Sequence, residues 1–122
     1  MKKLFAIMAS MMFTMSACAD YKQIIQFNEL PQAAQDFVTQ YYNTTDIMHI
    51  ETEQDGLTKD YTVYLNNGTQ IDFEHNGQLE SIDCKQSAVP EGIVPQAINT
   101  YVKTNHPNLF IVEYHIEYRR LT

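Results

Sequence analysis

Apolar residues recur with a helical period in two separate stretches of this chain. In 30–41 and 94–102, an apolar side chain returns every three or four positions. Pro31 and Pro95 open the two stretches, at a place where a helix has no partner for a backbone N–H. We predict two helices, each with one buried face. The apolar positions of these faces are Leu30, Ala33, Ala34, Phe37, Val38, Tyr41, Val94, Ala97, Ile98, Tyr101 and Val102.

A strand pattern follows each predicted helix. Apolar and polar residues alternate in 46–53 and 111–122, and three further segments, 59–65, 69–75 and 78–83, follow the first of these. Because alternate side chains of a strand lie on opposite faces of a sheet, one set is expected to face the helix. That inward set is Met48, Ile50, Thr52, Tyr61, Val63, Leu65, Ile71 and Phe73, with Val112, Tyr114 and Ile116 in the last segment.

Two Asn-Gly pairs separate the three central strands. Asn67-Gly68 and Asn76-Gly77 favour tight hairpins, because both residue types accept a positive φ at low cost. The first helix and the strands after it therefore predict an antiparallel four-stranded meander.

The chain contains an internal repeat with an offset of 64 residues. Residues 30–58 align with 94–122 without a gap, and eight of the 29 aligned positions are identical. We predict an α+β fold of two tandem helix-plus-meander units, one at 25–86 and a partial one at 87–122. Thr122 aligns with Thr58, just before the hairpin strands of unit one, so the second unit is expected to be truncated. The alternative is a second unit that never had a hairpin.

The first nineteen residues have the pattern of a secretory leader. Lys2 and Lys3 precede an apolar run, and small residues follow it. Ala17-Cys18-Ala19 fits a cleavage site before Asp20, which leaves a single domain at 20–122. The same residues resemble a lipobox, in which Cys18 would carry a lipid. Export to the periplasm or cell surface is expected either way, with no transmembrane segment in the mature chain.

Charge and residue types exclude several functions. Residues 20–122 contain six basic and fifteen acidic side chains, a net charge of −9 that disfavours nucleic acid as a partner. The four histidines form no metal-binding motif, and neither Ser81 nor Ser87 lies in a nucleophile motif. No glycine-rich phosphate loop is present. We therefore expect no catalytic site, no metal and no cofactor, and a non-enzymatic protein.

The outward residues of the predicted sheet form the candidate site. Alternation gives this face an aromatic side chain, Tyr64, among carboxylates, a combination found at protein interfaces. The alternative is an ordinary solvated sheet face. The predicted protein-binding face comprises His49, Glu51, Glu53, Thr62, Tyr64, Gln70, Asp72 and Glu74.

Several motifs resemble a family of small exported Bacteroidetes proteins. They are Leu30-Pro31 before a helix, a Tyr61-x-Val63-x-Leu65 strand, and an Ile71-x-Phe73 strand between the two Asn-Gly turns. This is the β-lactamase-inhibitor-like, PepSY-like family. The resemblance implies a protein-binding module, with a secreted hydrolase or peptidase as the partner that it would inhibit or modulate. The alternative class is a structural or accessory protein of the cell envelope, without inhibitory activity.

Overall fold

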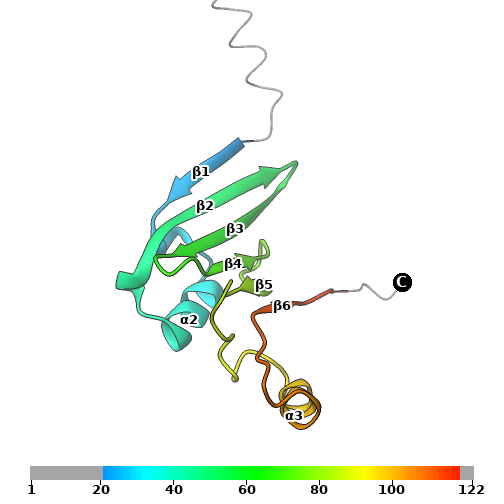
Figure 1. The fold of residues 1–122 in the computed structure, drawn as a ribbon. Coiled ribbons are helices and arrows are strands. Elements are labelled where there is room, and N and C mark those ends of the chain that lie inside the picture. The colour runs from blue at the N-terminus through cyan, green and yellow to red at the C-terminus, as the bar shows by residue number, and fades with distance from the viewer. Residues whose placement is uncertain (1–20, 119–122) are drawn as a thin grey trace, which may run out of the picture.

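A six-stranded antiparallel sheet forms the body of the protein in the computed structural model, which describes residues 21–118. Each strand pairs with the next in sequence, so the sheet is a meander from β1 to β6 (Figure 1). The predicted leader, Cys18 and residues 119–122 lie outside the described residues. The strands are β1 (Tyr21–Ile25), β2 (Ile47–Asp55), β3 (Thr58–Leu65), β4 (Gln70–Phe73), β5 (Leu79–Asp83) and β6 (Glu113–His115).

The two helices repeat each other at the predicted offset. Helix α2 spans Gln32–Tyr41 and α3 spans Gln96–Asn105, so both ends are displaced by the same 64 residues. A proline with φ −53° caps each N-terminus. Two short 3₁₀ helices, η1 (Phe27–Glu29) and η2 (Thr44–Asp46), flank α2. The α+β fold with two helix-containing repeats is therefore confirmed.

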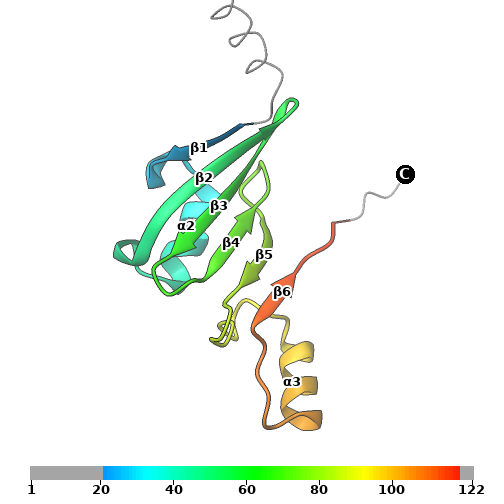
Figure 2. The same ribbon diagram turned by 45° about the horizontal axis from the view of Figure 1, so that its top comes forward.

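Helix α2 covers one face of the sheet, which we call the inner face (Figure 2). Its Ala34 and Val38 are fully buried, as the helical period predicted. The alternation of the central strands is also confirmed, since their predicted inward residues lie in the same core. The buried apolar residues are Leu30, Ala34, Val38, Ile50, Val63, Leu65, Ile71, Phe73, Ile82, Cys84, Val89 and Val94.

The prediction for Met48 was wrong. Its side chain is 58% exposed, whereas Ile50 and Thr52 of the same strand are buried. The pairing of β2 with β3 shifts between Ile47 and His49, so Met48 is the extra residue of a β-bulge. The extra residue of a bulge interrupts the alternation of inward and outward side chains, so a prediction that assumes strict alternation misplaces it.

The sequence analysis also missed strand β1. It pairs antiparallel with β2, with Lys22 opposite Glu53 and Ile25 opposite Ile50. Each helix thus connects two strands that pair as antiparallel neighbours in the sheet. Helix α2 connects β1 to β2, and α3 connects β5 to β6.

Helix α3 departs from its predicted burial. Its Ile98 and Tyr101 are 42% and 60% exposed, although they align with the core residue Ala34 and the partly buried Phe37. Figures 1 and 2 show α3 at the end of the molecule beside β6, away from α2 and the central strands. Only Val94 of the expected apolar face is fully buried.

A side-chain amide holds each helix to the segment before it. Gln35 Nε2 in α2 donates to the carbonyl oxygen of Leu30 at 2.8 Å, and Asn99 Nδ2 in α3 donates to that of Val94 at 3.2 Å. The two donor residues are equivalent positions of the repeat, and so are the two acceptor residues. The same local hydrogen bond from a side-chain amide to a backbone carbonyl therefore occurs in both units, in addition to the apolar pattern.

Candidate protein-binding face

The strand register aligns polar side chains across the face opposite α2, which we call the outer face. Glu51 of β2 is opposite Thr62, Thr62 is opposite Asp72, and Asp72 is opposite Ser81. Ser81 is in turn opposite His115 on β6. One polar row thus crosses five strands, because directly opposed residues share a face.

An aromatic pair and a carboxylate form the first cluster on this face. The rings of His49 and Tyr64 stack with centroids 4.5 Å apart and planes at 22°. Both side chains also contact Glu51, whose Oε1 lies 3.3 Å from His49 Nε2 and whose Oε2 accepts from the Tyr64 hydroxyl at 3.3 Å. These contacts fix the orientation of Tyr64, which lowers the conformational entropy lost when a partner binds it.

Asp72 is the centre of a second cluster. Its Oδ1 accepts from the Thr62 hydroxyl at 2.8 Å and from Gln70 Nε2 at 3.5 Å. Its Oδ2 accepts from the Ser81 hydroxyl at 2.9 Å. The carboxylate is therefore held from strands on both sides, and the middle of the outer face is a set of fixed polar groups.

Crowding of carboxylates changes the acid–base behaviour of this face. Burial raises the pKa of the Tyr64 hydroxyl, and the negative charge of Glu51 raises it further. Burial also raises the pKa of the Glu80 carboxyl, with Asp60 the largest of the neighbouring charges that add to the effect and His115 opposing it. The outer face is thus a negatively charged surface in which added negative charge is unfavourable.

The structure brings most of the predicted residues together. Six of the eight belong to the two clusters, while Glu53 lies opposite Asp60 on the exposed part of β2, and Glu74 follows the end of β4. Their role in binding stays a prediction. The predicted face did not include Ser81 and His115, which complete the polar row; their alignment with Asp72 follows only from the pairing of β4 with β5 and of β5 with β6.

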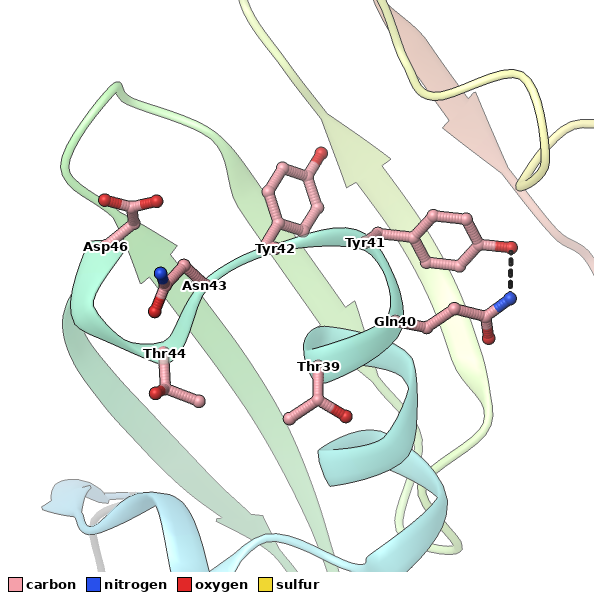
Figure 3. A pocket seen from close by; sticks show the side chains of 7 residues that line it. All are labelled: Thr39, Gln40, Tyr41, Tyr42, Asn43, Thr44 and Asp46. Atoms are coloured by element: carbon pink, nitrogen blue, oxygen red, sulfur yellow. Dashed lines mark hydrogen bonds between the residues drawn. The ribbon is translucent and has the colours of Figure 1, made fainter.

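A shallow depression of about 620 Å³ lies at the C-terminal end of α2, around Tyr41 and Tyr42. Figure 3 shows its side chains pointing apart, with Tyr41 and Gln40 at one end and Asp46 at the other. Polar groups that converge on one point distinguish a ligand pocket from a surface hollow. This depression therefore ranks below the outer face as a candidate site.

Reactive and metal-binding groups are sparse in the described part of the chain. Cys84 is buried in the core, and its Sγ lies 3.7 Å from the Tyr42 hydroxyl, whose pKa is raised by burial. Within residues 21–118, no cluster of three or more His, Cys, Asp or Glu side chains has a metal-binding arrangement. No helix of these residues has both the length and the apolar character needed to cross a bilayer.

Comparison with protein families matches nearly the whole chain. The family described as "Putative beta-lactamase-inhibitor-like, PepSY-like" matches residues 17–59 and 59–121. The chain belongs to this family. The first matched segment contains β1, α2 and β2, and the second contains α3, the strands β4 to β6, and β3 from Lys59 onward. Two matched segments in one chain agree with the internal repeat.

Solved structures of similar proteins have the same fold. A "putative calcium-regulated periplasmic protein" from Bacteroides thetaiotaomicron is 35% identical with a TM-score of 0.72, over 79% of this chain and 76% of that one. A periplasmic protein from Bacteroides vulgatus is also 35% identical, with a TM-score of 0.75 over 81% and 78% of the two chains. A second B. vulgatus periplasmic protein, of unknown function, is 31% identical with a TM-score of 0.71 over 81% and 79%. Comparison with curated protein sequences gave no match.

Proposed function

We propose that the protein is an exported, non-enzymatic binding module that holds a protein partner on its outer sheet face. The observation that carries this proposal is the fixed arrangement of Tyr64 among acceptor groups. The Tyr64 ring stacks on His49, and its hydroxyl donates a hydrogen bond to Glu51. Nearby, the Asp72 carboxylate accepts three side-chain hydrogen bonds. Fixed aromatic side chains are frequent binding hot spots.

The charge of the face defines the chemistry of the partner. Glu51, Glu53 and Asp72 lie on it, and the chain from residue 20 onward has a net charge of −9. A partner with a basic patch would be drawn to this surface by long-range attraction. The family description supports a secreted hydrolase or peptidase as that partner, with the module inhibiting or modulating it.

An accessory role in the envelope is the second candidate. Its support is that the similar structures are described as periplasmic proteins, and none of these descriptions names a hydrolase. A partner can be captured from an envelope extract with the purified protein as bait, and titration of the protein against that partner separates the two roles. Stoichiometric loss of the partner's activity favours inhibition, whereas binding without such loss favours the accessory role.

The binding proposal is tested by reversing one charge on each side of the molecule. Glu53→Lys changes the exposed rim of the outer face, and Asp36→Lys makes the same change on α2, beyond the inner face. We expect Glu53→Lys to weaken partner binding roughly tenfold at low salt and Asp36→Lys to leave it nearly unchanged. Equal effects of the two variants would contradict the proposal.

Attachment to the membrane is a separate question. We propose that the domain acts in the periplasm or at the cell surface, either free after cleavage or tethered through a lipid on Cys18. The mass of the protein isolated from its own envelope distinguishes the two forms. A mass equal to that of a chain beginning at Asp20 supports the free form. A mass larger by a diacylglycerol group on Cys18 supports the tether.

A further inference from the structure

The two Asn-Gly turns of the meander have the same local geometry. Asn67 and Gly68 lie between β3 and β4, and Asn76 and Gly77 lie between β4 and β5. The glycine φ is +92° in the first turn and +87° in the second. In each turn the glycine amide donates to the carbonyl three residues earlier, at 3.0 Å and 2.9 Å. The asparagine Oδ1 accepts from the amide two residues later, at 2.9 Å and 3.0 Å, so the two turns differ only in their surroundings.

An asparagine that precedes glycine can lose its side-chain amide without an enzyme. The glycine backbone nitrogen gives up its proton and attacks the asparagine Cγ, and the new C–N bond closes a five-membered succinimide ring. The side-chain nitrogen leaves as ammonia. Water then opens the ring at either carbonyl, which gives aspartate or isoaspartate, and nothing is oxidised or reduced. Glycine favours the attack because it has no Cβ to crowd the approach.

The closed turn holds the reacting groups apart. In the first turn the Gly68 amide is bonded to the Leu65 carbonyl, and Asn67 Oδ1 is bonded to the Thr69 amide. Both hydrogen bonds must break before the glycine nitrogen reaches Cγ. The same two conditions hold in the second turn. In the folded protein, the rate at each asparagine therefore follows the fraction of time for which its turn is open.

Packing differs sharply between the two turns. Gly77 is buried against α2, and a Cβ added there would lie 2.8 Å from Pro31 Cβ and 3.1 Å from the Ala34 nitrogen. The second turn cannot open without leaving the helix. Gly68 is exposed, and among the described residues a Cβ added there would meet only Lys85 Cγ, at 3.8 Å. The first turn is therefore free to open into solvent.

One hydrogen bond acts against this difference. Thr69 is buried and Gln78 is exposed, so the bond from the Thr69 amide to Asn67 is the better shielded of the two. A single neutral hydrogen bond contributes only a modest net stability. Opening of the second turn removes all the contacts of Gly77 with the start of α2, which is the larger loss.

We propose that Asn67 is a site of spontaneous deamidation in the folded protein, and that α2 protects Asn76 from the same reaction. The product carries a carboxylate in place of an amide, and isoaspartate also lengthens the backbone by a methylene group. Tyr64 and Gln70 form the last pair of β3 and β4 before this turn. The modification thus alters the turn next to the strand pair that carries Tyr64.

Ageing of the purified, folded protein at mildly alkaline pH tests this inference. Peptide mapping by mass spectrometry follows the conversion at each asparagine, and chromatography separates aspartate from isoaspartate. We expect Asn67 to convert about tenfold faster than Asn76 in the folded protein. In concentrated urea neither turn is formed, so the two rates should become similar.

Two serine variants provide matched controls. Asn67→Ser should remove the main acidic species that accumulates on ion exchange, whereas Asn76→Ser should leave it in place. Conversion of Asn76 as fast as that of Asn67 in the folded protein would overturn the proposal. So would a ratio of rates that urea does not change, or an Asn67 that stays intact in the folded protein while the chain in urea converts.

Discussion

At the scale of single residues, Gly77 is the position where the structure most strongly requires glycine. Its φ is +87°, and an added Cβ would lie 2.8 Å from Pro31 Cβ and 3.1 Å from the Ala34 nitrogen. The Asn76-Gly77 turn is therefore pressed against the start of α2. We expect Gly77→Ala to lower the free energy of unfolding by about 2–4 kcal/mol, from the positive φ together with the clash.

Gly56 provides the matched control for this prediction. Its φ is +65°, but nothing lies within 4 Å of the added Cβ. Gly56→Ala is expected to cost only about 1–2 kcal/mol, the conformational part of the effect. Urea unfolding of both variants measures the difference, and equal losses would show that the contact with α2 does not matter.

Glu80 is a residue whose charge should be unfavourable in the folded protein. Its pKa is raised by burial and by neighbouring carboxylates, so the folded state holds the proton more tightly than the unfolded state does. The stability from this group is complete below the ordinary pKa of a carboxyl and is lost as pH rises through the folded value. Glu80→Gln should therefore stabilise the protein at pH 7, by less than about 1 kcal/mol because the group is partly solvated.

The pH dependence of that variant supplies its own control. Below the ordinary carboxyl range both Glu80 and its glutamine replacement are neutral, and the stability difference should vanish. Thermal unfolding at pH 7 and at pH 3.5 measures it. A Glu80→Gln variant that is less stable than the parent at pH 7 would contradict the electrostatic account of the outer face.

Burial at single positions was predictable wherever alternation is regular. Ile71 and Phe73 were expected in the core and are fully buried there. Met48 was misplaced because a bulge depends on how β2 pairs with β3, and pairing depends on residues distant in the sequence. For the same reason the contribution of Ser81 to the outer face was not foreseen, since it becomes visible only when β4 is placed beside β5.

At the scale of elements, the amide bonds of Gln35 and Asn99 anchor the two helices in equivalent ways. Asn99 is buried and donates to two carbonyls, those of Glu91 and Val94. Since α3 has few buried apolar residues, this amide should contribute a large share of its local stability. Asn99→Ala is expected to lower the free energy of local opening of α3 by about 1–3 kcal/mol.

Hydrogen exchange of the backbone amides measures this effect. After Asn99→Ala, exchange should accelerate in α3, whereas Gln35→Ala should leave the core amides of α2 protected because Ala34 and Val38 still anchor that helix. Unchanged exchange in α3 would mean that its packing, and not the amide, holds it in place.

Helices and central strands were the predictable elements, because their apolar periods are long and their turns carry Asn-Gly signals. The limits of α2 and α3 even keep the repeat offset of the sequence. Strand β1 was missed because Tyr21–Ile25 is short and follows a segment that reads as a leader. The aligned Gln35 and Asn99 were visible in the repeat, but their hydrogen bonds could not be inferred from an amide pair alone.

At the scale of the whole molecule, the two faces of the sheet differ in composition. Helix α2 and the core account for the inner face, while the outer face carries fixed polar groups around Tyr64 and Asp72. The apolar pattern of α3 predicted a buried face, and the structure leaves Ile98 and Tyr101 exposed. A sequence pattern shows that a helix has an apolar face, but it does not show whether that face is buried in the fold.

The central claim is that the outer face binds a protein partner. Site-specific photo-cross-linking in the native envelope tests it most directly, with a photoreactive phenylalanine derivative at Tyr64 and, as the control, at Asp36 on α2. We predict one discrete protein adduct from position 64 and none from position 36. No adduct at position 64, or the same adduct from both positions, would contradict a binding role for this face.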